Sequence, residues 1–279
     1  MNANKNSSRR RQEGNKNFKK TSRKPSFKNK DSINKASKNK PEASKGIRLN
    51  KYISNSGICS RREADVFISA GSATVNGKVI TEMGYKVQEN DEVRFDGSLI
   101  SPEAKRYVLL NKPKNYITTM DDDRGRRTVM DLVANASKER IYPVGRLDRN
   151  TTGVLMFTND GELAKKLTHP KHKVQKLYHA TLDKKLSMKD FHAIADGFEL
   201  DGRHLVVDEI SYIPNQSKRE VGIKIHSGRN RIVRRIFEHF GYTVIKLDRV
   251  VFAGLTKKNL QRGHWRHLTQ LEVSTLNML

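Results

Sequence analysis

The sequence contains little cysteine and no long apolar run. One cysteine, Cys59, in 279 residues excludes an internal disulfide framework and any cysteine-rich metal site. A single thiol also suits a reducing compartment. No apolar run approaches the roughly 18–20 residues that a membrane-spanning helix needs, and no apolar core follows the N-terminal cations as it would in a secretory signal. These absences predict a cytoplasmic protein without a membrane segment.

Acidic residues are also scarce. Thirty Asp and Glu stand against 55 Lys and Arg, which gives a net charge of +25 and a pI near 10.1. Residues 1–45 hold fifteen Lys and Arg and three Asp and Glu, or +12, which leaves +13 for residues 46–279. Cations that displace condensed counterions bind phosphate backbones. The excess in both parts therefore predicts a nucleic-acid partner.

Residues 1–45 are rich in Asn, Lys, Arg and Ser and have few apolar residues. Such a segment buries too little apolar surface to offset its ordering entropy, so we predict a disordered basic tail. Its composition is compatible with a solubilising tail and with a non-specific RNA tether. The composition alone does not distinguish the two.

Residues 46–97 are predicted to form a small α/β module. Leu49, Tyr52 and Ile53 have helical spacing, and Ser60 followed by Glu63 is a capping box that begins a second helix. The Asn-Gly pair within residues 74–79 favours a tight hairpin, and further short strands follow. Cys59 is interpreted as a small buried hydrophobic residue of this module.

The segments Arg-Leu-Asn-Lys at 48–51, Ser-Arg-Arg-Glu-Ala at 60–64 and Val-Asn-Gly-Lys at 75–78 resemble the RNA-binding domain named after a small-subunit ribosomal protein. The resemblance implies that the two helices and the hairpin present a basic face to structured RNA. The alternative for each cation is an ordinary solvated surface charge. The candidate RNA-binding residues are Arg48, Lys51, Arg61, Arg62 and Lys78.

Residues 98–106 are predicted to be a linker, and residues 107–279 a strand-rich mixed α+β domain with few, short helices. Strands are expected near 107–110, 176–182, 205–213 and 221–226, with closing strands between 244 and 252. Short helices are expected after residue 160 and from residue 228 to Gly241. The fold class as a whole is α+β.

The stretch Gly-Arg-Leu-Asp-Arg-Asn-Thr-Thr-Gly at residues 145–153 places Asp148 between two arginines, at a predicted turn between apolar segments. Taken alone, the local sequence favours a surface salt-bridge partner for Asp148. No phosphate-binding loop, dinucleotide motif, Gly-x-Ser-x-Gly elbow or Cys-x-x-Cys pair is present. His169 and His172 flank a proline, and Asp121 to Asp123 are consecutive, so both segments are interpreted as loops and no metal site is predicted.

The motif around Asp148 resembles the catalytic motif of RNA pseudouridine synthases. The similarity extends to Asn-Lys-Pro at 111–113, Lys-Leu-Tyr at 176–178 and Gly-Arg-Asn-Arg-Ile-Val-Arg-Arg at 228–235. This arrangement is that of the bacterial ribosomal subfamily of small-subunit synthase A and large-subunit synthases B, E and F, and residues 159–164 and 167–170 favour the B type. Ile232 departs from the Gln that the subfamily often has.

The resemblance implies that Asp148 is the catalytic carboxylate, either attacking the sugar or taking a proton from it. Arg234 would pair with Asp148, and Tyr178 would stack on the base and help to remove the proton from carbon 5. Three residues would contact the substrate or support its pocket: Arg146, which would fill the place of the flipped base, Lys112 and Val233. An isomerisation requires no cofactor.

We therefore expect a monomeric enzyme whose partner is ribosomal RNA, most simply large-subunit rRNA. A small-subunit target and a non-catalytic RNA-binding assembly factor remain the alternatives. A glycoside hydrolase would need a second acid, for which the sequence offers no convincing residue.

Overall fold

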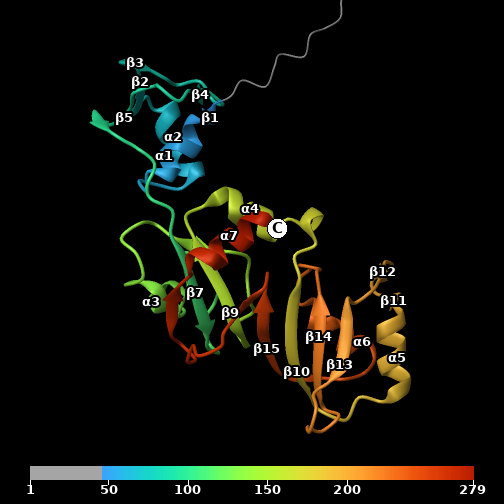
Figure 1. Ribbon diagram of the computed structural model, residues 1–279. Coiled ribbons are helices and arrows are strands. Elements are labelled where there is room, and N and C mark those ends of the chain that lie inside the picture. Colours follow the sequence, from blue (N-terminus) through green and yellow to red (C-terminus); the bar gives the residue numbers. More distant parts are fainter. Residues whose placement is uncertain (1–45) are drawn as a thin grey trace, which may run out of the picture. The chain divides into compact units, whose positions relative to one another are not determined.

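The fold is described by a computed structural model for residues 46–279 (Figure 1). The predicted basic tail at residues 1–45 lies outside the described residues. The described part is a mixed α+β structure with a small four-stranded sheet and a nine-stranded sheet. Within residues 46–279, no helix has the length and apolar character needed to cross a membrane.

The N-terminal module contains the predicted helices and hairpin. Its elements are β1 (Ile47–Arg48), α1 (Leu49–Asn55), α2 (Arg61–Ser69), β2 (Ala73–Val75), β3 (Lys78–Val79), β4 (Lys86–Val87), β5 (Val93–Phe95) and β6 (Ser98–Leu99). The capping box is present, since the Glu63 amide donates to the Ser60 hydroxyl and the Ser60 amide donates to the Glu63 carboxylate. Asn76 and Gly77 have φ of 51° and 77°, as the tight turn requires.

The core of this module joins both helices to the sheet. Leu49 and Ile53 of α1 pack with Ala64 and Ile68 of α2. Cys59 is buried in the same cluster, as predicted, and burial raises the pKa of its thiol. A raised pKa keeps the thiol protonated, so Cys59 is a packing residue.

The predicted linker begins inside a strand. Residues 98 and 99 form β6, which pairs antiparallel with β5. Asp96 and Gly97 have positive φ and form the turn of this second hairpin. The first two residues of the predicted linker therefore belong to the module.

The large sheet has the order β13-β14-β10-β15-β9-β7-β17, with β8 and β16 pairing beside it. Its strands are β7 (Tyr107–Lys112), β8 (Tyr142–Pro143), β9 (Thr151–Thr158), β10 (Lys176–Leu182), β13 (Glu209–Tyr212), β14 (Glu220–Ile225), β15 (Val244–Phe252), β16 (Leu255–Thr256) and β17 (Trp265–His267). β9 and β15 pair in parallel, while the other strand pairs of this sheet are antiparallel. A side chain at Gly153, which pairs with Arg249, would bring its Cβ to 2.1 Å from the Arg249 carbonyl oxygen.

The remaining elements of this part are α3 (Met130–Val133), α4 (Gly161–Thr168), η1 (Pro170–His172), α5 (Met188–Asp196), β11 (Phe198–Glu199), β12 (His204–Leu205), α6 (Ile232–His239) and α7 (Gln270–Met278). Asp160 caps α4, and Leu163 and Leu167 point inward as predicted. α6 starts four residues later than the expected start at residue 228, because Arg231 adopts a left-handed conformation with φ of 48°. Helices α5 and α7 were not predicted.

Strand β9 is buried along its whole length and divides two hydrophobic clusters. Leu155 and Phe157 belong to the cluster that α6 covers, whereas Val154 and Met156 belong to the one that α4 and α7 cover. The turn before β9, which carries Asp148, is therefore anchored at the centre of the sheet, beside β15 and close to β10.

Candidate active site

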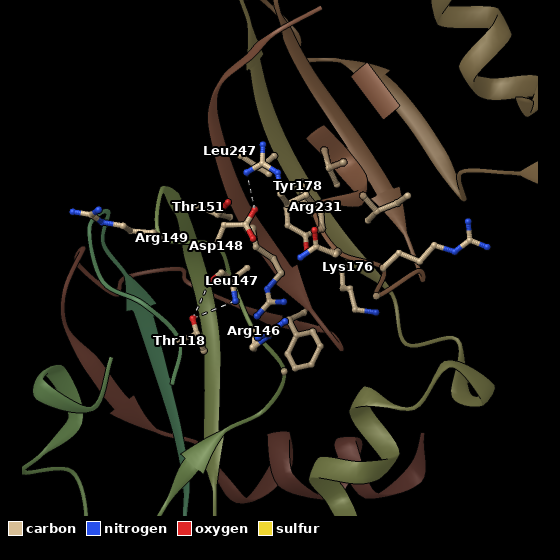
Figure 2. A pocket seen from close by; sticks show the side chains of 18 of the residues that line it. Thr118, Arg146, Leu147, Asp148, Arg149, Thr151, Lys176, Tyr178, Arg231 and Leu247 are labelled. Carbon is tan, nitrogen blue, oxygen red and sulfur yellow. Dashed lines mark hydrogen bonds and ion pairs between the residues drawn. The ribbon is translucent and has the colours of Figure 1, made fainter. Parts of the chain in front are cut away.

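A cavity of about 590 Å³ lies where the turn before β9 meets β10, β15 and the loop before α6. Asp148, Tyr178, Arg146 and Val233 all line it, although they come from three separate segments. Figure 2 shows Arg146, Asp148 and Tyr178 around this cavity. Arg234 is not among the lining residues, but its Nε lies 3.9 Å from Asp148 Oδ2. The structure thus brings together five of the six residues that the sequence predicted as catalytic or substrate-binding.

The carboxylate of Asp148 is attracted by two arginines without being locked to either. Its Oδ2 atom lies 3.9 Å from Arg234 Nε and 3.9 Å from Arg231 Nη1. Asp148 is 35% exposed toward the cavity, whereas Arg234 is 11% exposed and donates from Nη1 to the Val244 carbonyl at 2.6 Å. Burial and then Arg231 lower the pKa of Arg234, and Asp148 opposes them. The arrangement places two guanidinium groups beside a carboxylate that remains accessible.

Lys112, which was predicted among the substrate-binding residues, is enclosed beneath the cavity. Its side chain has no exposed surface, and its Nζ lies within hydrogen-bond distance of four carbonyl oxygens, those of Pro113, Asp148, Arg149 and Thr151, at 2.9–3.3 Å. Burial lowers its pKa to about 8, partly opposed by Asp148. Lys112 therefore holds the backbone of the turn and cannot reach a substrate.

Thr118, which the sequence analysis missed, fixes the same turn from the other side. Its hydroxyl donates to the Leu147 carbonyl at 2.9 Å and accepts from the Leu147 amide at 3.3 Å (Figure 2). Leu147 itself is buried in the core. The residue before Asp148 is thus held by its backbone and its side chain, so the carboxylate has a defined direction.

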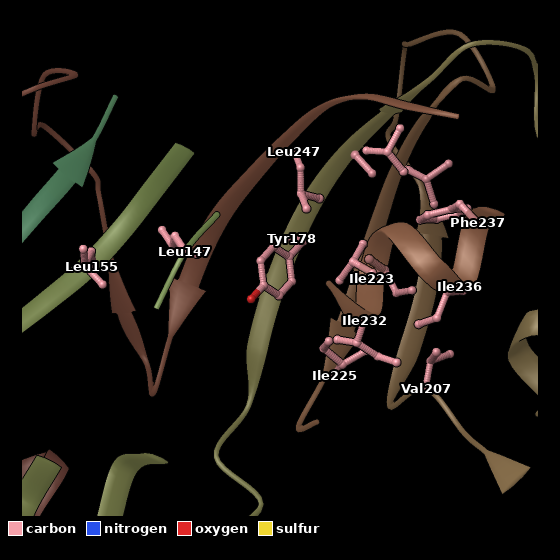
Figure 3. Close-up of a cluster of buried hydrophobic side chains, with 14 of the residues drawn as sticks. Leu147, Leu155, Tyr178, Val207, Ile223, Ile225, Ile232, Ile236, Phe237 and Leu247 are labelled. Atoms are coloured by element: carbon pink, nitrogen blue, oxygen red, sulfur yellow. The ribbon is translucent and has the colours of Figure 1, made fainter. Parts of the chain in front are cut away.

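Tyr178 lies on the inward face of β10, together with Ala180 and Leu182, as the alternation predicted. It is 9% exposed, and Figure 3 shows its ring beside Leu247, with the hydroxyl on the side away from Ile223. An aromatic ring at a cavity wall suits stacking on a base.

Val233 is buried in the wall of the cavity, while Arg146 is exposed at its rim. A buried apolar side chain and an exposed guanidinium correspond to the two places that the resemblance implied for them.

Several further lining residues were missed. Lys176 donates from Nζ to the carbonyls of Val174 and His226 at 2.9 and 2.8 Å, and burial followed by Arg249 lowers its pKa to about 8. Arg249 is 3% exposed in β15. The alternation of side chains along a strand could have predicted the position of Arg249. It comes two residues after Leu247 in β15, so both side chains point to the same inward face.

The two segments that raised the question of metal binding have other roles. Asp122 pairs with Arg126, which lowers the pKa of Asp122 to about 2. His169 caps the short 3-10 helix η1, accepting from the Lys171 amide, and His172 is the last residue of that helix. Throughout residues 46–279, no group of three or more His, Cys, Asp or Glu side chains is arranged to hold a metal ion.

Four of the predicted RNA-binding residues, Arg48, Arg61, Arg62 and Lys78, are exposed. Lys51, in contrast, is half-buried, and its ammonium group pairs with the carboxylate of Glu162. It is therefore less free to bind a phosphate. Arg61 and Arg62 occupy the first turn of α2, where a cation is unfavourable beside the positive end of the helix dipole. Neither contributes to the core of the module.

Comparison with known proteins agrees with this geometry. The family described as RNA pseudouridylate synthase matches residues 106–239, and the S4 domain matches residues 47–93. The chain is 40% identical over 235 residues to the ribosomal large subunit pseudouridine synthase B of Bacillus subtilis (strain 168), covering 83% of this chain and 96% of that protein. It is 38% identical over 233 residues to the dual-specificity RNA pseudouridine synthase RluF of Escherichia coli (strain K12), covering 82% and 78%.

A crystal structure of a pseudouridylate synthase superimposes with a TM-score of 0.58 at 28% identity, covering 82% of this chain and 99% of that one. The chain therefore belongs to the RNA pseudouridine synthase family and is an enzyme, with an S4 domain before the synthase domain. The family and the α+β fold predicted from the motifs are confirmed.

Proposed function

We propose that this enzyme converts a uridine of ribosomal RNA into pseudouridine in the cytoplasm, and that its target lies in large-subunit rRNA. The observation that carries the proposal is the accessible Asp148 carboxylate beside Arg234, in a cavity whose wall includes Tyr178. Two relatives, a ribosomal large subunit pseudouridine synthase and a dual-specificity RNA pseudouridine synthase, support an RNA target of this kind.

In this proposal the Asp148 carboxylate acts on the ribose, either by attacking C1′ or by taking a proton from C2′. The bond between C1′ and N1 breaks with its electron pair going to the uracil, the base turns, and C5 bonds to C1′. Arg234, whose Nε lies 3.9 Å from Asp148 Oδ2, directs the carboxylate at the sugar. Loss of the proton from C5 completes an isomerisation that needs no cofactor.

The uridine has to leave its stack to enter the cavity, which costs a few kcal/mol. Arg146 stands exposed at the rim, where its planar guanidinium can stack in the place that the base leaves. Val233 and the ring of Tyr178 supply apolar surface for the base inside.

The experiment that tests the function is a map of pseudouridines in both ribosomal RNAs of a deletion strain. We expect one site in large-subunit rRNA to disappear and to return with the wild-type gene. A missing site in small-subunit rRNA would overturn the large-subunit target but keep the enzyme class. If neither RNA changes, the proposed function is wrong.

We expect Arg61→Gln with Arg62→Gln to weaken RNA binding nearly uniformly across RNA sequences. Both arginines are exposed at the start of α2. Each lost phosphate contact should reduce the slope of the logarithm of the binding constant against the logarithm of the salt concentration by about 1. Filter binding at several salt concentrations measures this. The control is Lys138→Gln, also exposed but outside the module. An unchanged slope would remove the two arginines from the RNA interface.

Thr118→Val is expected to slow turnover by roughly 10- to 100-fold, because a small displacement of a reacting group has effects of this size. The substitution keeps the shape but leaves both backbone groups of Leu147 without their partner. Single-turnover tritium release measures it. Thr181→Val is the control, since it removes one hydroxyl bond, to Glu220, away from the cavity. Equal rates for the two variants would contradict the role of Thr118.

Raising the pH from 7 to 9 is expected to slow turnover without loosening the fold. Burial lowers the pKa of Lys112 to about 8 from its ordinary 10.5. Above pH 8 the folded protein loses this proton while the unfolded chain keeps it to about 10.5, so this group's contribution to the free energy of unfolding rises with pH. The neutral amine, however, has two N–H donors instead of three for four carbonyls.

The measurement is a pH series of single-turnover rates together with denaturant unfolding. Lys176 also has a pKa lowered to about 8, so Lys176→Gln is the matched variant. A decline with a midpoint near 8 that persists in this variant assigns the effect to Lys112. A decline that vanishes in Lys176→Gln would assign it to Lys176.

A further inference from the structure

Arg249 is a buried cation in the cavity wall that has no acidic partner. It is 3% exposed, its Nε donates to the Val154 carbonyl at 2.8 Å, and its guanidinium lies 4.6 Å from the ring centre of Phe252. Among the described residues, no carboxylate pairs with it, and its Nη2 has no hydrogen-bond partner. Burying an unpaired charge costs several kcal/mol. Packing alone therefore does not account for an arginine at this position.

The neighbour of Arg249 is the tyrosine of the site. β10 and β15 pair antiparallel, with Tyr178 opposite Arg249, and both residues line the cavity. Directly opposite residues of an antiparallel pair point to the same face, so the guanidinium and the phenol lie on one side of the sheet. Burial lowers the pKa of Arg249, and Tyr178 opposes this. Two contacts thus hold the guanidinium, a carbonyl of β9 and an aromatic ring of β15, and the cross-strand neighbour of Arg249 in the cavity is the phenol of β10.

We propose that Arg249 is the positioning residue of Tyr178, holding the phenol oxygen toward the base and stabilising negative charge on it when it receives the proton from C5. This inference rests on the proposed function and deepens it. A phenol oxygen accepts a proton only once its own proton has left, here to water. The oxygen then carries a negative charge, which a neighbouring cation favours in a site of low dielectric.

The step balances without a further reactant. After C5 has bonded to C1′, C5 carries one hydrogen and the ring has a double bond between N1 and C6. The C5–H bond breaks, its electron pair forms the C5–C6 double bond, and the N1–C6 pair moves to N1, which takes a proton from water. The C5 proton goes to the Tyr178 oxygen and from there to water.

A purely structural role, in which Arg249 ties β9 to β15 through Val154, predicts a different kinetic pattern. It would disturb every step of the reaction, whereas the positioning role affects only the loss of the C5 proton. Uridine that carries deuterium at C5 reports on that loss. 5-Fluorouridine has no C5 proton, so its rearrangement reports the steps up to the new carbon–carbon bond.

The experiment uses the full chain and a transcribed rRNA fragment under single-turnover conditions with saturating enzyme. We expect Arg249→Gln to slow conversion of uridine by ~10²-fold and to unmask a primary deuterium isotope effect at C5. Rearrangement of the 5-fluorouridine fragment should stay within about threefold of wild type. Tyr178→Phe should show the same pattern, and the double variant should be no slower than the slower single variant.

Arg219→Gln is the matched control, because it also removes an Arg Nε bond to a strand carbonyl, that of Leu182, outside the cavity. It should react like wild type. If Arg249→Gln does not fold, Arg249→Lys, which keeps the charge but loses the planar fork, is measured for the same isotope effect. Equal slowing of uridine and 5-fluorouridine, or no slowing, would overturn the positioning role. A wild-type protein inactive on every rRNA would instead overturn the proposed function.

Discussion

Asp148→Asn is expected to reduce turnover at least ~10⁴-fold, the scale on which loss of a reacting group is felt. The amide keeps the shape of the side chain but is neither nucleophile nor base, so either route at the ribose fails. Within residues 46–279 the carboxylate makes no hydrogen bond, and its ion pairs with Arg231 and Arg234 are both 3.9 Å long, so the fold should remain intact. Release of tritium from uracil C5 of undermodified rRNA measures the loss.

RNA binding separates this chemical role from a structural one. The variant should bind the rRNA fragment within about threefold of wild type, because no phosphate contact is removed. Asp196→Asn, an exposed aspartate at the end of α5, is the control and should be fully active. Substantial tritium release by Asp148→Asn would exclude Asp148 as the reacting group. If the wild-type enzyme also left the rRNA unmodified, the result would indicate a binding or assembly role instead.

The parts of the fold that could be predicted are those that depend on neighbours in the sequence. The capping box at Ser60 and the Asn-Gly turn at residues 76–77 are local signals, and both gave correct elements. The alternation that placed Tyr178 inward is equally local. Helices α5 and α7 carry comparable signals, Ser187 with Asp190 and Thr269 with Glu272. They could have been predicted from their caps.

The parts of the site that could not be predicted depend on distant pairing. Thr118 meets Leu147 across 29 residues, and Arg249 meets Tyr178 because β15 lies between β9 and β10. Neither contact follows from spacing along the chain. Arg231 approaches Asp148 because its backbone is left-handed before α6. This conformation is uncommon for arginine and cannot be predicted from the residue type. The resemblance identified the reacting groups, and the topology reveals what holds them.

Lys112→Met is expected to have the largest effect on the fold, with the free energy of unfolding falling by ~3 kcal/mol and turnover by ~10²-fold. The thioether fills much of the space but offers no donor, so buried carbonyls of the turn lose their partner. Relief from burying an ammonium offsets part of the loss, since burial already lowers the pKa of Lys112 to about 8. Urea unfolding and single-turnover rates measure the two effects.

The two measurements decide what Lys112 does. Lys166→Met is the control, because this half-buried lysine also donates to a carbonyl, that of Asn277, in a solvent-exposed bond. Its loss should change stability by no more than ~0.5 kcal/mol. If Lys112→Met lost activity while unfolding at the wild-type urea concentration, the lysine would act in the chemistry and not on the backbone. Because its side chain has no exposed surface, we expect stability and turnover to fall together. In that case the position of the Asp148 carboxylate depends on Lys112, a buried cation that does not contact the substrate.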